Sequence, residues 1–231
     1  MELIRSRRAI RKYKENLIES DKANLIDAEL QNINLESGFK FQMILNNDEV
    51  LGNKIITFGM FKNARNIIAL VGPSSSNDID KEVDEKIGYY GARILLFIES
   101  INLSTCFITG TFSRAKTRAS INKGETLFGI ISFGECDETK KPRKTKNIED
   151  VSDYKEGDPD WYLRGIEAAL LAPTAVNQQA FEIINDGHKF VYIRNLVGFN
   201  TALDAGIIHY FFEKAADSDA YIWKRIHNRN R

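Results

Sequence analysis

Apolar residues recur along this chain in two rhythms, one matching the turn of a helix and one alternating as in a strand. The helical rhythm predicts helices over residues 20–34, 79–101, 159–171 and 201–216. Short runs rich in β-branched and aromatic residues predict strands over residues 39–45, 66–71, 107–109, 126–133, 181–184 and 190–193. Helices mixed with strands in this order, including a hairpin, predict the α+β class.

Local signals define several boundaries. Asp158 is the predicted N-cap of the helix over residues 159–171, with a proline in the first helical position, and Pro173 is predicted to stop that helix. The turn residues 185–187 join two predicted strands into a hairpin. The start of the chain shows little strand alternation, so it is predicted to open a further helix.

The composition changes between residues 136 and 157, where charged residues replace large apolar ones. Such a stretch is typical of a surface segment or a connector. We therefore predict two parts, residues 1–150 and 151–231, with one compact domain as the alternative.

The chain of 231 residues is electrically balanced, with 32 acidic and 32 basic side chains. This balance argues against a protein that coats nucleic acid, so any anion site must be local. Cys106 and Cys136 lie far apart and outside any Cys-x-x-Cys pattern, which predicts free thiols rather than a disulfide scaffold or a zinc site. The charged start and the lack of a long apolar run predict a cytoplasmic protein without a membrane span.

Positive charge is concentrated in two places. Six of the ten residues 5–14, called the basic segment below, are Lys or Arg, and none is acidic. On a helix Arg7 and Arg11 would share a face, where two guanidinium groups could grip a phosphate; the alternative is a solvated basic face. Five of the seven residues 140–146 are also basic, and they could either add phosphate contacts or form a solvated loop.

A third candidate is the stretch LAPTAVNQQ over residues 171–179, between a predicted helix and a predicted strand. Its small and amide side chains leave backbone groups, a hydroxyl and amides open to a polar ligand. The alternative is an ordinary loop, because threonine and asparagine commonly form loops.

Four stretches taken in order, RSRRAIRKYK, ITGTFSRAK, FGECDETKKPRKTK and LLAPTAVNQQAFEI, together resemble the FMN-dependent nitroreductase family. The resemblance is greatest to a bacterial branch first seen in thermophiles, in which the Ala-Pro-Ser-like loop comes late in the chain. The stretch from Leu203 to His209 is similar to that branch's Leu-Asp-x-Gly-x-x-x-His. The match extends over nearly the whole chain.

This resemblance implies a nitroreductase-like fold, with a mixed or antiparallel central sheet flanked by helices, and a bound FMN. The FMN phosphate would meet Arg7 and the cations of residues 143–146. Arg11 would approach the flavin pyrimidine edge, where a cation stabilises the negative charge of reduced flavin. Backbone amides after residue 109 would face flavin N5, and the proline-containing loop would line the ring. The implied cofactor-binding residues are Arg7, Arg8, Ala9, Arg11, Gly110, Thr111, Arg143, Lys144, Lys146, Pro173, Thr174, Ala175 and Asn177.

The implied enzyme is an FMN-dependent NAD(P)H oxidoreductase. NAD(P)H would deliver hydride to the flavin and leave, and a nitroaromatic, quinone or similar electron-poor acceptor would follow in a ping-pong mechanism. Positioning dominates hydride transfer, so no side chain is predicted as a catalytic group, and no metal is predicted. His209, within an apolar helix, is predicted to be a core histidine, whereas His188 and His227 are predicted at the surface.

The late position of the proline-containing loop has an architectural implication. In other family members this loop follows the first helix, and each subunit lends it to the other. Here residues 1–150 and 151–231 would act as the two halves of an internal pseudo-dimer around one FMN, in a monomer or a homodimer.

Two other functions stay open. The protein could bind flavin without turnover, for storage or redox sensing. It could instead bind nucleic acid through its basic start and the tail over residues 224–231, which we favour less. Near those charges only Tyr13 and Trp223 offer aromatic rings for stacking on bases.

Overall fold

The structure, a computed structural model, describes residues 1–74, 80–137, 142–187 and 189–225. The chain divides into two compact units. Unit 1 comprises Met1–Arg5, Asp84–Ala92 and Arg143–Arg231, and unit 2 comprises Ser6–Val83 and Arg93–Pro142. Each unit is therefore assembled from segments that are distant in the sequence.

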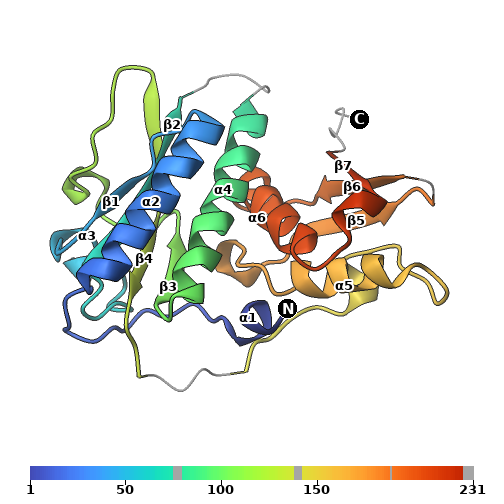
Figure 1. Cartoon of the computed structure of the whole chain (residues 1–231), viewed down its shortest axis with the longest axis horizontal. Helices are drawn as coiled ribbons and strands as arrows, with labels where there is room; N and C mark the ends of the chain where they lie inside the picture. Colours follow the sequence, from blue (N-terminus) through green and yellow to red (C-terminus); the bar gives the residue numbers. More distant parts are fainter. Residues whose placement is uncertain (75–79, 138–141, 188, 226–231) are drawn as a thin grey trace. The chain divides into compact units, whose positions relative to one another are not determined.

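Unit 2 is built on an antiparallel sheet in the order β1-β2-β4-β3. Its strands are β1 (Gln42–Ile44), β2 (Asn66–Pro73), β3 (Ser104–Ile108) and β4 (Glu125–Gly134). Helix α2 (Ser20–Ser37) lies along one face of this sheet in Figure 1 and buries Ile26, Leu30 and Ile33, as its spacing predicts. A short helix, α3 (Glu49–Gly52), follows β1. The helix and strands predicted for this part of the chain are confirmed.

The long helix predicted over residues 79–101 is also confirmed. It is α4 (Asp80–Ser100), and it contributes residues to both units. Ile94, Leu95 and Ile98 in its second half are fully buried, as the run of apolar residues there predicts.

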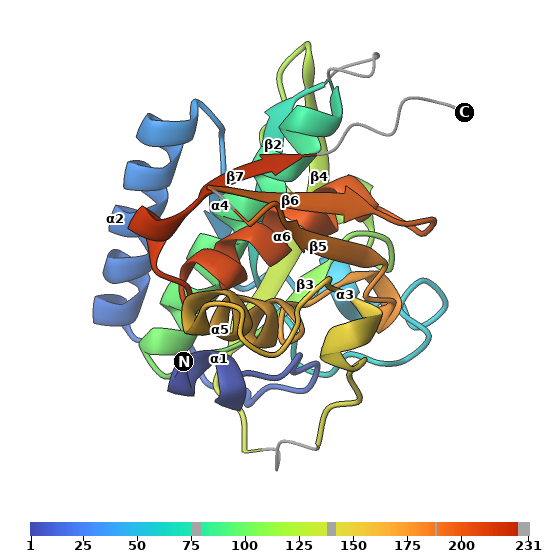
Figure 2. The same ribbon diagram turned by 90° about the vertical axis from the view of Figure 1, so that its right-hand side faces the viewer.

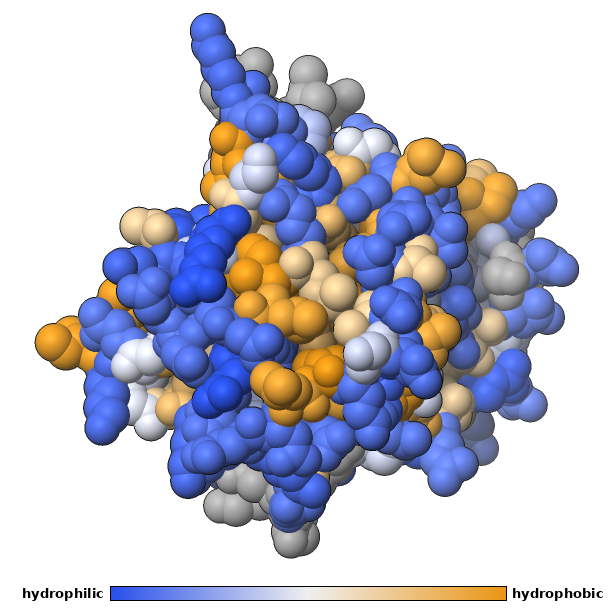
Figure 3. Space-filling model, turned by 60° about the vertical axis from the view of Figure 1, so that its left-hand side comes forward, coloured by the Kyte–Doolittle hydropathy of each residue, from blue (hydrophilic) through white to orange (hydrophobic). Residues whose placement is uncertain are grey.

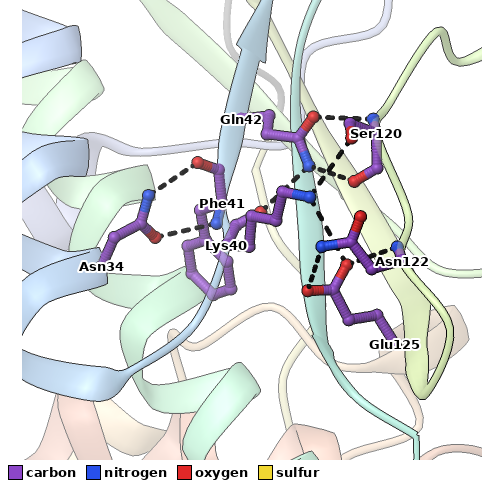
Figure 4. A network of polar contacts seen from close by, with 7 residues as sticks. All are labelled: Asn34, Lys40, Phe41, Gln42, Ser120, Asn122 and Glu125. Carbon is purple, nitrogen blue, oxygen red and sulfur yellow. Dashed lines mark hydrogen bonds and ion pairs between the residues drawn. The ribbon is translucent and has the colours of Figure 1, made fainter.

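A network of amide side chains fixes the start of β1 (Figure 4). The Asn34 amide, near the end of α2, donates to the Phe41 carbonyl at 2.9 Å and accepts from the Phe41 N–H at 2.8 Å. The Gln42 amide makes the same two-way contact with the Ser120 backbone, at 2.9 and 2.8 Å. These side-chain amides bond to backbone groups that have no partner in the neighbouring strands. They therefore anchor α2 and the loop around Ser120 to the edge strand β1.

The chain opens on a helix, as predicted, but that helix does not extend over the basic segment. Helix α1 covers only Glu2–Ser6, and the residues after it pair as a strand does. Ala9 forms a parallel bridge with Thr105 on β3, and the Ile10 N–H donates to the Thr105 carbonyl at 2.9 Å. Because β3 ends its sheet, its open edge offers these backbone groups partners, whereas a short isolated helix is costly to nucleate.

Besides most of α1 and part of α4, unit 1 includes two further helices and a mixed sheet in the order β5-β6-β7. The helices are α5 (Asp160–Ala169) and α6 (Thr201–Glu213), and the strands are β5 (Phe181–Asn185), β6 (Phe190–Asn195) and β7 (Ile222–Arg225). Figure 2 shows α5 and α6 beside this sheet. The predicted hairpin is confirmed as β5–β6, and the α+β class is confirmed by the two units together. Strand β7, which pairs with β6 in parallel, escaped prediction because it is short and merges with a basic tail.

Two details of α5 differ from the prediction. Its N-cap is Pro159, not Asp158. The Asp158 carboxylate instead accepts the Lys155 N–H at 2.8 Å, which closes the preceding turn. The helix also ends at Ala169, before Pro173 is reached.

Exposed apolar side chains interrupt a mostly hydrophilic surface, visible as orange among blue on the face in Figure 3. In unit 2 Ile55 and Phe58 are 86% and 78% exposed, and in unit 1 Val176 is 86% exposed. Cys106 and Cys136 are free thiols, as predicted. Among the described residues, no helix combines the length and the apolar character needed to cross a bilayer.

Candidate functional site

The predicted ligands in the basic segment differ widely in their exposure to solvent. Arg7 is 2% exposed and Arg8 is half-buried, whereas Ala9 and Arg11 are exposed. Because the segment is extended, Arg7 and Arg11 do not share a helix face, so the helical spacing no longer supports a paired grip on a phosphate. Arg11 presents its charge to solvent, so it is the better placed of the two to meet an anion.

Arg7 belongs to a buried polar cluster. Burial lowers the pKa of its guanidinium, and the negative charge of the nearby Glu99 opposes that shift. The Glu99 carboxylate accepts the Thr105 N–H at 2.9 Å and the Thr105 hydroxyl at 2.7 Å. This cluster ties the basic segment to α4 and β3, so Arg7 has a structural role beside any role toward a ligand.

The predicted loop containing Gly110 and Thr111 follows directly after β3. A side chain placed on Gly110 would meet no atom within 4 Å, so the backbone there faces open space. Arg114 braces the loop, because its guanidinium donates to the Thr109 carbonyl at 3.3 Å and lies 5.1 Å from the centre of the Phe112 ring. In unit 2 the structure thus brings this loop and the basic segment to the same strand.

In unit 1 the structure joins the other two groups of predicted ligands. The Asn177 amide donates to the Lys144 carbonyl at 3.0 Å, and the Arg143 guanidinium donates to the Leu171 carbonyl. Residues 143–146 and the 173–179 loop therefore form one hydrogen-bonded structure. The predicted residues Lys140 and Lys141 of this basic run lie outside the described residues.

Lys146 is occupied within this structure. Its N–H donates to the Gln179 side-chain carbonyl at 2.8 Å, and its ammonium donates to the Gln179 backbone carbonyl at 2.8 Å. The side chain of Lys144 is exposed, and unlike the Lys146 ammonium it does not hold the Gln179 carbonyl. Of the basic residues 143–146, two thus brace the loop, and Lys144 is the one best placed for an anion.

The 173–179 loop has an unusual backbone. Val176, Asn177 and Gln179 all have positive φ, at 46°, 55° and 46°. Non-glycine residues pay for this left-handed conformation, on the order of 1 kcal/mol each, and the cost is greatest for β-branched valine. Such strain persists only where the surroundings fix it, and it concentrates at ligand sites.

Gln179 is one of the groups that fix the loop. It is 2% exposed, and its amide donates to the Leu170 carbonyl at 2.8 Å. The Thr174 hydroxyl accepts the Gln179 N–H at 3.1 Å, and the Asn177 N–H donates to the Thr174 carbonyl at 2.9 Å. Thr174, near the start of the loop, is thereby bonded to residues near its end.

Asp204 and Gln178 also hold this loop, and sequence reasoning did not assign them to the site. The Asp204 carboxylate, on α6, accepts the Ala175 N–H at 3.1 and 3.0 Å and the Gln178 amide at 2.9 Å. The signal that could have found Asp204 is an acidic residue inside the apolar stretch LDAGIIHYFF, since buried carboxylates need dedicated partners.

His209 is a packed residue, as predicted. Its ring stacks on Trp223 with centroids 4.4 Å apart, and it lies 5.1 Å from the Tyr89 ring. Burial lowers the pKa of His209 to about 3, so its imidazole is neutral near pH 7 and is not an imidazolium acid. His188 and His227 lie outside the described residues.

The aromatic residues that would support nucleic-acid binding are engaged elsewhere. Tyr13 is 5% exposed, and its hydroxyl bonds to the Ile10 carbonyl at 2.7 Å. Trp223 has one ring face covered by His209. Stacking on bases needs an accessible ring, so this hypothesis loses support. Residues 226–231 of the basic tail lie outside the described residues.

The fold defines an α+β protein with one antiparallel and one mixed sheet. Its sequence is matched over residues 1–216 by the family model described as "Putative TM nitroreductase". The chain therefore belongs to this nitroreductase family, and the resemblance found in its motifs is confirmed.

Solved structures of nitroreductases have a similar fold. A putative nitroreductase from Thermotoga maritima is similar with a TM-score of 0.62 and 17% identity, over 91% of this chain and 80% of that one. A nitroreductase family protein from Streptococcus pneumoniae has a TM-score of 0.54 and 14% identity, over 67% and 98%. A putative nitroreductase from Desulfovibrio desulfuricans, in complex with FMN, has a TM-score of 0.50 and 18% identity, over 68% and 96%. No curated protein matches the chain.

The residues present fit an FMN in their chemistry. Arg11 and Lys144 are exposed cations that can meet a phosphate, and the backbone at Gly110 is open to a ligand. The strained 173–179 loop is held by several hydrogen bonds, and its small and amide side chains suit contact with the polar edge of a flat ring.

Proposed function

We propose that this protein is an FMN-dependent oxidoreductase. In this proposal it takes hydride from NAD(P)H and reduces a nitroaromatic, a quinone or a similar electron-poor acceptor in a ping-pong mechanism. One observation carries the proposal: a chain of the nitroreductase family holds the strained 173–179 loop in place from several directions. Maintaining that strain is costly, and a ligand that needs the loop in this shape explains why it is kept.

The proposed FMN ligands are those that the sequence predicts, with their tasks refined by exposure. Arg11 and Lys144 would meet the anionic and electron-rich edges of FMN, because both are exposed. Arg7 and Lys146 would support the FMN site indirectly, because Arg7 is buried beside Glu99 and Lys146 donates to the Gln179 carbonyl. Arg8, Ala9, Gly110, Thr111, Arg143, Pro173, Thr174, Ala175 and Asn177 complete the proposed set.

When bound, FMN would supply the ring that accepts hydride from NAD(P)H and returns electrons to the acceptor. The chain itself would bind the phosphate, orient the ring and offer backbone amides from Gly110 and Thr111. A cation such as Arg11 near the pyrimidine edge would favour the reduced, negatively charged cofactor. Orientation is the main contribution that a protein makes to hydride transfer, so no nucleophilic side chain is required.

We further propose one FMN per chain, held by residues from both sequence halves, 1–150 and 151–231, as an internal pseudo-dimer. Nine of the proposed ligands fall in the first part and four in the second, because the proline-containing loop comes late in this chain. A purified protein with close to one flavin per chain is the expected result. A ratio close to two would overturn this stoichiometry.

An absorption spectrum of the purified protein tests the proposed function. We expect a yellow protein whose flavin bands bleach on adding NADH or NADPH and return on adding a nitroaromatic or a quinone. A protein that binds no FMN when titrated with it would refute the proposal. Flavin that binds but does not turn over with any of these acceptors would favour storage or redox sensing.

Replacing Arg11 tests the proposed ligands. Arg11→Ala should raise the dissociation constant of FMN at least about tenfold, since a hydrogen bond to a charged group contributes about 1.5–3 kcal/mol. The matched control is Lys12→Ala, which removes an adjacent exposed charge of the same sign. Equal losses in both variants would indicate general attraction between charges rather than a contact made by Arg11.

A further inference from the structure

The buried carboxylate of Asp204 connects the 173–179 loop to α6. Asp204 is 5% exposed and stands in the first turn of α6. Both of its oxygens accept the Ala175 N–H, at 3.1 and 3.0 Å. Ala175 immediately precedes the left-handed Val176, so this contact fixes the backbone at the point where the strain begins.

Gln178 extends the connection to a second loop. Its amide nitrogen donates to Asp204 at 2.9 Å and to the Phe199 carbonyl at 2.6 Å. Its amide oxygen accepts the Phe199 N–H at 3.0 Å. The strained loop, the loop before α6 and α6 itself are thereby joined through one amide and one carboxylate.

Stability does not explain the choice of a carboxylate here. A buried carboxylate loses its hydration, and burial raises the pKa of Asp204 to about 7 against the opposing effect of its hydrogen bonds. Burying it therefore costs free energy that its hydrogen bonds offset only in part. The contribution of the carboxylate is to fix directions, because it accepts hydrogen bonds from two loop residues, Ala175 and Gln178, at once.

We propose that Asp204 is a positioning residue of the 173–179 loop. Through Ala175 and Gln178 it holds this loop in the shape that receives FMN. This inference rests on the proposed function. Asp204 acts through the loop backbone and touches neither the cofactor nor the reacting atoms. The shape exists before the ligand arrives, so the binding energy of FMN is not consumed in ordering the loop.

The test compares Asp204→Asn with Asp153→Asn in the full chain. Asp153, in the same unit, also accepts hydrogen bonds, from the Tyr162 hydroxyl at 2.6 Å and the Asn185 N–H at 3.1 Å, and it has no bond to the loop. Asp204→Asn places an amide nitrogen opposite that of Gln178, which removes one of the two contacts. Gln178→Ala is a second variant that leaves the Asp204–Ala175 contact in place.

Two quantities are measured well below the unfolding temperature of each variant. Hydrogen–deuterium exchange over residues 173–179 reports the order of the loop without FMN, and titration with FMN reports the dissociation constant. We expect Asp204→Asn to speed exchange in this loop and to raise the dissociation constant about tenfold, with a smaller effect in Gln178→Ala. Asp153→Asn should change neither quantity.

The outcomes separate the two proposals. Wild-type protein that binds FMN, together with an Asp204→Asn variant of unchanged affinity, overturns the positioning role and leaves the proposed function standing. Equal losses in Asp204→Asn and Asp153→Asn also overturn it, because the effect would then be general destabilisation. Wild-type protein that binds no FMN overturns the proposed function, and the positioning role with it.

Discussion

Two opposing effects determine the pKa of the Asp204 carboxyl group. Desolvation favours its neutral form, and the hydrogen bonds from Gln178 and Ala175 favour its charged form. Desolvation is the larger, so the pKa of Asp204 is raised in the folded protein from the usual 3.8 to about 7. Between these values the folded state binds more protons than the unfolded state.

This shift predicts a pH dependence of stability. The contribution of Asp204 is fully present below about pH 4 and is lost as pH rises through about 7, by about 1 kcal/mol per pH unit in that window. Asp204→Asn cannot titrate, so the stability of the wild type relative to this variant should fall between pH 5 and pH 8. Urea unfolding of both proteins at the two pH values measures it. A difference that stays constant with pH would contradict the raised pKa.

Single residues also show where prediction from sequence stops. The motifs predict Asn177 and Lys144 as members of one site, and the structure joins the two residues by a hydrogen bond from the Asn177 amide to the Lys144 carbonyl. The motifs do not predict that Arg7 is buried beside Glu99, or that the Lys146 ammonium donates to the Gln179 carbonyl. Burial and partners depend on residues far away in the chain, which local patterns do not encode.

At the scale of elements, the contact between α4 and α6 within unit 1 depends on two glycines. A Cβ on Gly206 would lie 1.8 Å from the Glu85 carbonyl oxygen, and one on Gly88 would lie 2.0 Å from the Leu203 carbonyl oxygen. The backbones of the two helices therefore touch directly. Gly206 is the glycine of the Leu-Asp-x-Gly stretch, and this contact gives a physical reason for it.

Gly206→Ala should therefore destabilise the protein. The methyl group meets backbone that cannot move aside, and we expect a loss of about 2–3 kcal/mol, even though alanine favours helix more than glycine does. The control is Gly52→Ala in α3, where an added Cβ meets nothing within 4 Å. Thermal unfolding should show a fall of about 5 °C or more for the first variant and little change for the second. Similar midpoints would mean that the helices are not in backbone contact.

Periodicity predicted most helices and strands, because the spacing of apolar residues is a local property. It failed at the basic segment, where the Ile10 N–H donates to Thr105 in β3. It also missed β7, whose four residues become a strand by pairing with β6. In both cases the partner strand, not the segment's own sequence, determines the conformation.

At the scale of the whole molecule, the chain has the fold and the family of nitroreductases. The proposed single FMN draws residues from both sequence halves, which makes a prediction about the chain as a whole. Saturating FMN should slow hydrogen–deuterium exchange in two separate regions, residues 7–11 and residues 173–179. A ligand that binds the folded state also stabilises it, by about 2.7 kcal/mol at a hundredfold excess over the dissociation constant.

Protection confined to one of these regions would contradict the internal pseudo-dimer. The exposed segment around Ile55 and Phe58 serves as an internal reference, since none of the proposed ligands lies there. Exchange in that segment should be the same with and without FMN.

The amino-acid sequence is sufficient to place most helices and strands and to identify the family, because both depend on local spacing and on short motifs in a fixed order. It does not reveal which cations stay exposed, which strand edge captures the basic segment, or that Asp204 holds a loop 29 residues away. Those features follow from burial and from pairing between distant segments, and they exist only once the chain has folded.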